Sequence, residues 1–202
     1  MDPIESAVVL KKARVNFRST LALSCLVLPG CTGPDEALDL LVSGGTVYDG
    51  TGSEGRRSDV GVIGDRIVEL GDLGQRSARQ VIDASGLAVA PGFINAHSWA
   101  TGSLLADGRS MSDLMQGVTT EVFGEGVTLG PLDDALRARF STERDPDFPP
   151  PGYPIEWTTL AEYLAHLEEK GVTPNVASFV GATTLRQYVI GDDDRPPDDD
   201  EL

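Results

Sequence analysis

The stretch from Ala90 to Trp99 constrains the fold of this 202-residue chain more than any other. An apolar run breaks at Pro91-Gly92, resumes as Phe93-Ile94 and leads to His97, one of only two histidines. Proline and glycine interrupt regular structure, and a short apolar segment bounded by them is typical of a buried strand. The pattern therefore predicts a histidine at the end of a buried strand, where barrel enzymes place their functional groups.

A second strand is indicated over residues 117–126, where a glycine turn precedes a short segment rich in β-branched residues. Glu125 lies at its end between two glycines, whose backbone freedom lets the carboxylate turn inward. Carboxylate and imidazole groups are both ligands that zinc accepts, so we take His97 and Glu125 as candidate metal ligands. If they share a zinc ion, the two side chains lie within about 5 Å of each other.

Each candidate ligand has a simpler alternative. His97 is equally explained as a hydrogen-bonded core histidine packed beside Trp99, and Glu125 as a solvated loop carboxylate. Glu121 lies four residues before Glu125, so regular strand alternation places both on the same side and makes Glu121 the next acidic candidate.

Helical patterns separate the predicted strands. Residues 107–117 predict a short helix that begins at Ser110 or Ser112, and residues 130–140 predict a helix with Pro131 or Leu132 in its first turn. Residues 158–171 predict a longer helix, with Thr158 or Thr159 as its cap, Gly171 as its end and one apolar stripe, and His166 falls near the polar margin of that stripe. The apolar stripe consists of Leu160, Tyr163, Leu164 and Leu167.

A third strand is predicted over residues 175–181, followed by a short helix or loop over 182–191. The earlier segment, residues 38–90, has the alternation of β-structure instead. Gly64-Asp65 predicts a hairpin turn, and Ser85-Gly86 predicts a second turn before the strand that ends at Ala90.

The order and spacing of several short motifs resemble the metal-dependent amidohydrolase superfamily, in particular its N-acyl-D-amino-acid deacylases, or D-aminoacylases. The resemblance runs from about Leu38 to Arg195. The motifs are residues 39–52, residues 59–71, Val81-Ile-Asp-Ala-Ser-Gly86 leading into Pro91-Gly-Phe-Ile94, and Gln116-Gly-Val-Thr-Thr120.

This resemblance implies an α/β fold: a small β-sandwich part over residues 31–90, then the start of a TIM-like (β/α)8 barrel over residues 91–191. A closed barrel of this type takes about 250 residues. The chain therefore has room for about three β/α units of an incomplete barrel and lacks the strands that complete the sandwich in relatives.

The resemblance also implies the chemistry, which is hydrolysis of a linear amide in an N-acyl-D-amino acid by water bound to one or two zinc ions. The chain departs from the family pattern at the metal ligands. Trp99 stands where the second histidine of a His-x-His pair is usual, and Asn95 where many relatives have aspartate. Gly126 stands in place of a metal-bridging cysteine, and Ala182 in place of a substrate-facing histidine.

Residues 1–30 resemble a lipoprotein-type signal peptide. Four basic residues precede the apolar stretch 21–28, which is too short for a membrane span of about 20 residues. Leu28-Pro-Gly-Cys31 resembles a lipoprotein cleavage box, with Cys31 as the lipidated residue. The sequence thus predicts a lipid-anchored protein of the bacterial cell envelope.

The charge of the chain argues against nucleic acid as a partner. The chain has 16 basic and 32 acidic residues, for a net charge of −16, and such a surface repels polyanions. Much of the excess lies in residues 192–202, an acidic, proline-broken segment that we interpret as a solvated tail.

Three functions remain open from the sequence. The first is a deacylase fragment that binds a small N-acyl amino acid and is completed by another chain. The second is an inactive amidohydrolase remnant, and the third is a lipid-anchored binding module.

Overall fold

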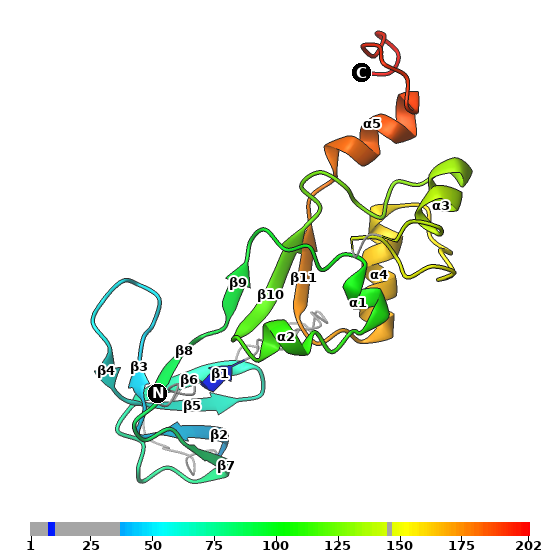
Figure 1. Ribbon diagram of the computed structural model, residues 1–202. Helices are drawn as coiled ribbons and strands as arrows, with labels where there is room; N and C mark the ends of the chain where they lie inside the picture. The colour runs from blue at the N-terminus through cyan, green and yellow to red at the C-terminus, as the bar shows by residue number, and fades with distance from the viewer. Residues whose placement is uncertain (1–7, 11–36, 145–146) are drawn as a thin grey trace, which may run out of the picture. The chain divides into compact units, whose positions relative to one another are not determined.

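The computed structural model describes residues 8–10, 37–144 and 147–202 (Figure 1). Most of the predicted signal peptide, and the predicted lipidation site Cys31, lie outside the described residues. The described chain divides into two compact units, the first ending at Pro91 and the second beginning at Gly92.

The first unit contains two four-stranded sheets. One has the order β6-β5-β2-β7, formed by Arg66–Gly71, Asp59–Ile63, Leu38–Ser43 and Ala78–Asp83. The other has the order β1-β8-β3-β4, formed by Val8–Leu10, Ala88–Pro91, Thr46–Val47 and Arg56–Arg57. Val42 and Val60 of the first sheet pack with Val47 and Val89 of the second, so the two sheets share one apolar core.

The turns of this unit are those that the sequence predicts. β5 and β6 pair antiparallel, with Ile63 opposite Arg66, across the Gly64-Asp65 turn. Gly86 has a φ of +77° in the connection from β7 to β8, a backbone conformation that glycine adopts without a steric penalty.

The second unit is built on a parallel sheet of three strands with the order β11-β10-β9. The strands are β9 (Phe93–Asn95), β10 (Val118–Phe123) and β11 (Asn175–Ser178). Between β9 and β10 lie α1 (Ser103–Ala106) and α2 (Met111–Leu114), and between β10 and β11 lie α3 (Asp134–Phe140) and α4 (Leu160–Lys170). Helix α5 (Ala182–Ile190) follows β11 (Figure 1).

A single apolar core joins β10 to the helices. Phe123 of β10 packs in one cluster with Leu104 of α1, Phe140 of α3 and Tyr163 of α4. The Tyr163 hydroxyl donates a hydrogen bond to the Thr101 carbonyl at 2.8 Å, which satisfies its only polar atom inside the core. The helices therefore cover one face of the three-stranded sheet.

Helix α4 has the ends that its sequence predicts. The Thr159 hydroxyl accepts a hydrogen bond from the Glu162 amide, and the Glu162 carboxylate accepts one from the Thr159 amide at 2.8 Å. These reciprocal bonds satisfy two amides that the first helical turn leaves unpaired. Gly171 ends the helix in the left-handed conformation.

The prediction for α3 was wrong at its start. The helix begins at Asp134 because the Asp133 carboxylate accepts a hydrogen bond from the Leu136 amide and so caps it. Leu132 instead lies buried before the helix, where its amide bonds to the Thr158 carbonyl. Helix α1 was not predicted, because its four residues are too few for a periodic pattern.

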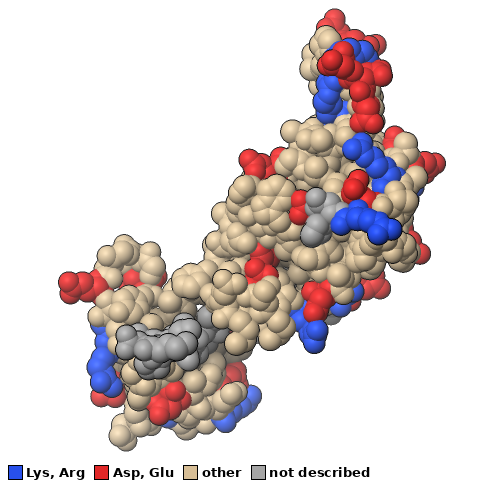
Figure 2. All heavy atoms as spheres, in the orientation of Figure 1, with Lys and Arg blue, Asp and Glu red and all other residues tan. Residues whose placement is uncertain are grey.

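The acidic segment is exposed over residues 192–200 but is organised by arginines. Arg195 makes two hydrogen bonds of 2.7 Å to the Glu201 carboxylate, and Arg186 donates to the carbonyl of Asp193. Acidic and basic side chains gather side by side at this end of the chain (Figure 2). Among the described residues, no helix has the length and hydropathy needed to span a membrane.

Candidate metal centre

The two predicted metal ligands lie on adjacent loops of the second unit. His97 follows β9, which ends at Asn95, and Glu125 follows β10, which ends at Phe123. Because neighbouring parallel strands end at the same edge of a sheet, the two loops emerge together. Nε2 of His97 lies 2.6 Å from Oε2 of Glu125, so the two side chains contact each other directly.

The backbone of the sheet positions both loops. The amide of Ser98, which follows His97, bonds to the Val122 carbonyl of β10 at 2.9 Å. Gly124 has a φ of +85°, and a Cβ at this position would lie 2.9 Å or less from Thr128, Ser178 and Phe179. Glycine is therefore required here, both for its backbone conformation and for the close approach of the neighbouring chain.

The pair faces solvent. The side chains of His97 and Glu125 are 64% and 74% exposed, so the alternative of a core histidine is wrong, whereas the alternative of a solvated Glu125 fits its exposure. The Trp99 ring lies 5.5 Å from the His97 ring and is itself 65% exposed. A solvent-exposed contact of this kind contributes at most about 1 kcal/mol to stability.

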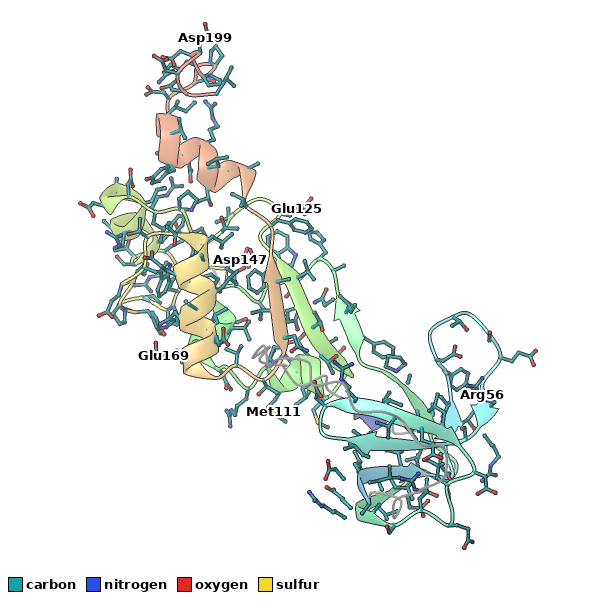
Figure 3. All side chains as sticks on the ribbon, turned by 180° about the vertical axis from the view of Figure 1, so that it is seen from behind. Arg56, Met111, Glu125, Asp147, Glu169 and Asp199 are labelled. Atoms are coloured by element: carbon teal, nitrogen blue, oxygen red, sulfur yellow. The ribbon has the colours of Figure 1, made fainter. Side chains whose placement is uncertain are left out.

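A shallow pocket lies beside the pair. Its lining includes His97, Trp99 and Glu125, together with Asp147 from the loop that precedes α4. Figure 3 labels Glu125 and Asp147. Sequence reasoning missed Asp147, because a carboxylate within a proline-rich loop has no periodic signal that would place it.

The donor set is of the right chemistry for a divalent metal but is too small. Imidazole nitrogen and carboxylate oxygen are both zinc ligands, and a structural or catalytic zinc takes at least three protein ligands. Within residues 8–10, 37–144 and 147–202, no group of three or more histidine, cysteine, aspartate or glutamate side chains is arranged to hold a metal ion. The described residues thus offer two candidate ligands and no complete site.

Three positions that depart from the family pattern can be located in the structure. Trp99, which has no lone pair to donate, extends from the His97 loop, defined here as residues 96–102. Gly126 has open space where a Cβ would lie, and Ala182 is exposed at the start of α5. None of these three positions adds a ligand atom.

The prediction for Glu121 was wrong. Its side chain is 0% exposed, whereas Glu125 faces solvent, because the strand ends at Phe123 and Gly124 redirects the chain. Neither carboxylate oxygen of Glu121 has a hydrogen-bond partner within the described structure. Burial raises the pKa of Glu121 above its ordinary value of 4.5, and the charge of Asp113 raises it further, while Ser98 and Asn95 partly lower it.

His166 lies away from this centre, as its sequence position predicts. It is half-buried on α4, where Nε2 lies 2.8 Å from the Tyr153 hydroxyl and the ring lies 5.0 Å from the Trp157 ring. These contacts explain His166 as a packing residue that ties the preceding loop to the helix.

Comparison with known proteins adds an independent observation. No family model matches the chain. The chain is 39% identical to a D-aminoacylase of Alcaligenes xylosoxydans xylosoxydans over 168 residues, which is 83% of this chain and 34% of that protein. It is 38% identical to an N-acyl-D-aspartate deacylase of the same organism, over 81% of this chain and 32% of the relative.

Solved structures give the same result. A D-aminoacylase structure, from work on its binuclear metal centre, matches with a TM-score of 0.70 and 38% identity over 81% of this chain and 34% of the other. The N-acyl-D-glutamate deacylase of Bordetella bronchiseptica, complexed with zinc and a phosphonate inhibitor, matches with a TM-score of 0.70 and 34% identity over 82% of this chain and 34% of the other. The chain spans about a third of the length of the relatives it matches.

Proposed function

Since this chain belongs to the D-aminoacylase family of amidohydrolases, of which it covers the N-terminal part, we propose that it is a portion of a hydrolase that deacylates N-acyl-D-amino acids. The observation that supports this proposal is the contact between His97 and Glu125, which follow the ends of adjacent parallel strands. Active sites of (β/α)8 enzymes lie at that edge of the sheet.

In this proposal, strands β9, β10 and β11 are the first three strands of a TIM-like barrel. Their parallel order and the helices between them support it. The residues before Pro91 are the β-sandwich part of the same enzyme. The remaining strands lie outside the described residues, in a continuation of the chain or in another chain.

His97 and Glu125 each contribute one ligand atom to a divalent metal in this proposal, and the other ligands lie outside the described residues. A metal held there would supply Lewis-acid chemistry, with a lower pKa for a bound water molecule and a polarised amide carbonyl. His97 and Glu125 would hold it, and the other residues described here would shape the pocket beside it. Trp99 forms an apolar wall on one side, where a substrate acyl group would pack.

Zinc binding by the 202-residue chain tests the ligand assignment. Cys25 and Cys31 should first be changed to serine, because free thiolates bind zinc and would obscure a weak site. In that background we expect weak zinc binding by calorimetry that His97→Ala and Glu125→Gln each abolish. His166→Gln is the matched control, because it removes the only other histidine, and it should leave binding unchanged. Zinc binding that survives His97→Ala would contradict the assignment.

A non-catalytic binding module is the second candidate, and Trp99 favours it. An indole in place of the second histidine, together with only two donors among the described residues, suits a pocket that holds a small molecule without turnover. An inactive remnant has the same features. If the chain retains no metal but binds an N-acyl-D-amino acid in equilibrium dialysis, the binding module is the correct function.

We also propose that the protein is a lipoprotein of the bacterial cell envelope, on the sequence of residues 1–31 alone. Expressed in a diderm bacterium, the protein should partition into the detergent phase of a phase-separation assay. Cys31→Ser should release the protein into the aqueous phase or block its processing. Cys25→Ser should change neither its partitioning nor its processing. A wild-type protein that is fully aqueous and retains residues 1–30 would contradict this proposal.

A further inference from the structure

The loop that carries Glu125 is bound to the first turn of α5. This Glu125 loop, residues 124–130, lies beside the start of the helix (Figure 1). The Thr183 amide donates a hydrogen bond to the Gly126 carbonyl at 2.9 Å. A Cβ at Gly181 would lie 2.6 Å from the Gly126 carbonyl oxygen, so the two segments are in close contact. The backbone beside Glu125 is therefore fixed by a helix that lies much later in the chain.

Two buried threonines join the loop to the helix through their hydroxyl groups. The Thr184 hydroxyl accepts a hydrogen bond from the Thr128 amide at 2.8 Å and donates one to the Thr128 carbonyl at 3.1 Å. The Thr128 hydroxyl donates to the Gly130 carbonyl at 2.7 Å and accepts from the Gly181 amide at 3.2 Å. Both threonines are 0% exposed, so these polar groups depend on their protein partners.

The Thr184 hydroxyl satisfies both backbone groups of one loop residue. A threonine hydroxyl has one donor and can also accept, and Thr184 uses both capacities on Thr128. It thereby takes the place that a neighbouring strand would have beside this part of the loop. Removing the hydroxyl would leave the amide and the carbonyl of Thr128 buried without it, which is unfavourable. The loop would then have to move until the two groups reach water.

The helix depends on the loop in return. No side chain caps α5, whose cap residue is Gly181. The first turn of a helix leaves its amides without partners inside the helix. The Gly181 amide is satisfied by the Thr128 hydroxyl and the Thr183 amide by the Gly126 carbonyl, so the Glu125 loop caps α5 from outside. The loop and the first turn of α5 thus stabilise each other.

We propose that Thr184 is a positioning residue for the candidate metal centre, whose hydroxyl holds the Glu125 loop where Glu125 meets His97. Thr128, to which it bonds, lies three residues after Glu125. The same loop also lines the pocket beside the pair. The inference rests on the proposed function for the role of Glu125 as a ligand, whereas the placement of Glu125 against His97 needs no such assumption.

A purely structural role for Thr184 predicts a different result. In that case, loss of the hydroxyl lowers the stability of the protein but leaves the contact between His97 and Glu125 unchanged. The test must therefore measure the contact itself, because a melting temperature would fall in either case.

The contact can be followed by NMR of the metal-free 202-residue chain with carbon-13 in its histidine rings. The chain has two histidines, and His166→Gln identifies the His97 signal. At one fixed pH, Glu125→Gln should shift the His97 signal, because Nε2 of His97 lies 2.6 Å from the Glu125 carboxylate. In a Thr184→Val background, that shift should fall to less than half, because the loop no longer holds Glu125 against His97.

Two control variants test the hydroxyl itself. Thr184→Ser keeps the hydroxyl and should restore the full response of His97 to Glu125→Gln. Thr183→Val makes the same chemical change one residue earlier, where the side chain is exposed. It keeps the backbone amide that bonds to Gly126, so the response should match that of the wild type.

Three results would overturn the inference. The first is a folded Thr184→Val protein in which His97 responds to Glu125→Gln as fully as in the wild type. The second is an equal loss of response in Thr183→Val. The third needs no variant and applies even if Thr184→Val does not fold. We expect slow hydrogen exchange at the Thr128 amide of the wild type, and exchange as fast as that of an exposed amide would show that Thr184 does not hold the loop.

These measurements contain no metal, so they fail or succeed separately from the zinc titration. A chain that binds no zinc but loses the His97 response in Thr184→Val refutes the ligand assignment and supports the positioning role. A chain that binds zinc through both ligands but keeps the full response in Thr184→Val refutes the positioning role alone.

Discussion

The two faces of the three-stranded sheet differ sharply in how completely they are covered. On the helix side of β10, Thr119, Glu121 and Phe123 are all buried. On the other side, Val118, Thr120 and Val122 are only half-buried. Ile94, which pairs in register with Thr120, leaves 65% of its surface exposed.

The comparison shows that the described residues form a finished core on one face and an open apolar surface on the other. Ile94, Val118 and Val122 place apolar side chains on this less covered face. Apolar surface that is left exposed is typical of an interaction site or favours association. The candidate metal centre lies at the edge of the same sheet. Its ligand set is also incomplete among the described residues.

The largest expected effect is on catalysis. The purified 202-residue chain should show no zinc-dependent hydrolysis of N-acyl-D-amino acids above background, because residues that act together in catalysis lose nearly all of their effect when most are absent. Release of free D-amino acid from a panel of N-acyl substrates measures this. Turnover by a monomer of this length would show that the open face needs no further chain.

The next effect is on stability and compares the two faces directly. Phe123→Ala should lower the free energy of unfolding by about 3–5 kcal/mol, because it removes a buried aromatic ring from the helix-side core. Ile94→Ala, on the open face, should change it by no more than about 0.5 kcal/mol. Denaturant unfolding followed by circular dichroism measures both. Equal losses would mean that a partner chain covers the open face.

A smaller effect is expected from the buried tyrosine. Tyr163→Phe should cost about 1 kcal/mol, since it leaves the Thr101 carbonyl without its hydrogen bond while the ring packing remains. Tyr188→Phe on α5 is the matched control, because that tyrosine is 41% exposed, whereas Tyr163 is fully buried. If the control variant is the more destabilised of the two in thermal unfolding, the helix-side core has been assigned incorrectly.

The smallest effect is a change in the pH dependence of stability. A buried acid whose pKa is raised, such as Glu121, contributes stability that is fully present below its unfolded pKa and is lost as the pH rises through its folded pKa. Glu121→Gln should therefore raise the melting temperature relative to wild type more at pH 8 than at pH 5. A melting-temperature difference that is the same at both pH values would contradict this prediction.

Asp59 of the first unit should behave in the opposite way. Hydrogen bonds from the amides of Gly44 and Leu73 lower its pKa, so its contribution is present above the unfolded pKa and is lost as the pH falls through the folded pKa. Asp59→Asn should destabilise the protein more at pH 7 than at pH 3, as measured by thermal unfolding.

The sequence by itself determined the features that depend on neighbouring residues. The capping box of α4, its terminal Gly171 and the hairpin at Gly64-Asp65 follow from short-range hydrogen bonds and backbone conformations, which a local pattern specifies. The placement of His97 and Glu125 at two strand ends was also predictable, because parallel strands end at a common edge. Their role as metal ligands stays a prediction.

Only the tertiary structure decided the features that depend on distant residues. The burial of Glu121 results from the helices that cover β10 and from the redirection of the chain at Gly124. The place of Asp147 beside the pocket depends on how a proline-rich loop packs before α4. A carboxylate has the same local sequence signal whether it is solvated or enclosed, so its environment, and hence its protonation, is set by packing that no short pattern encodes.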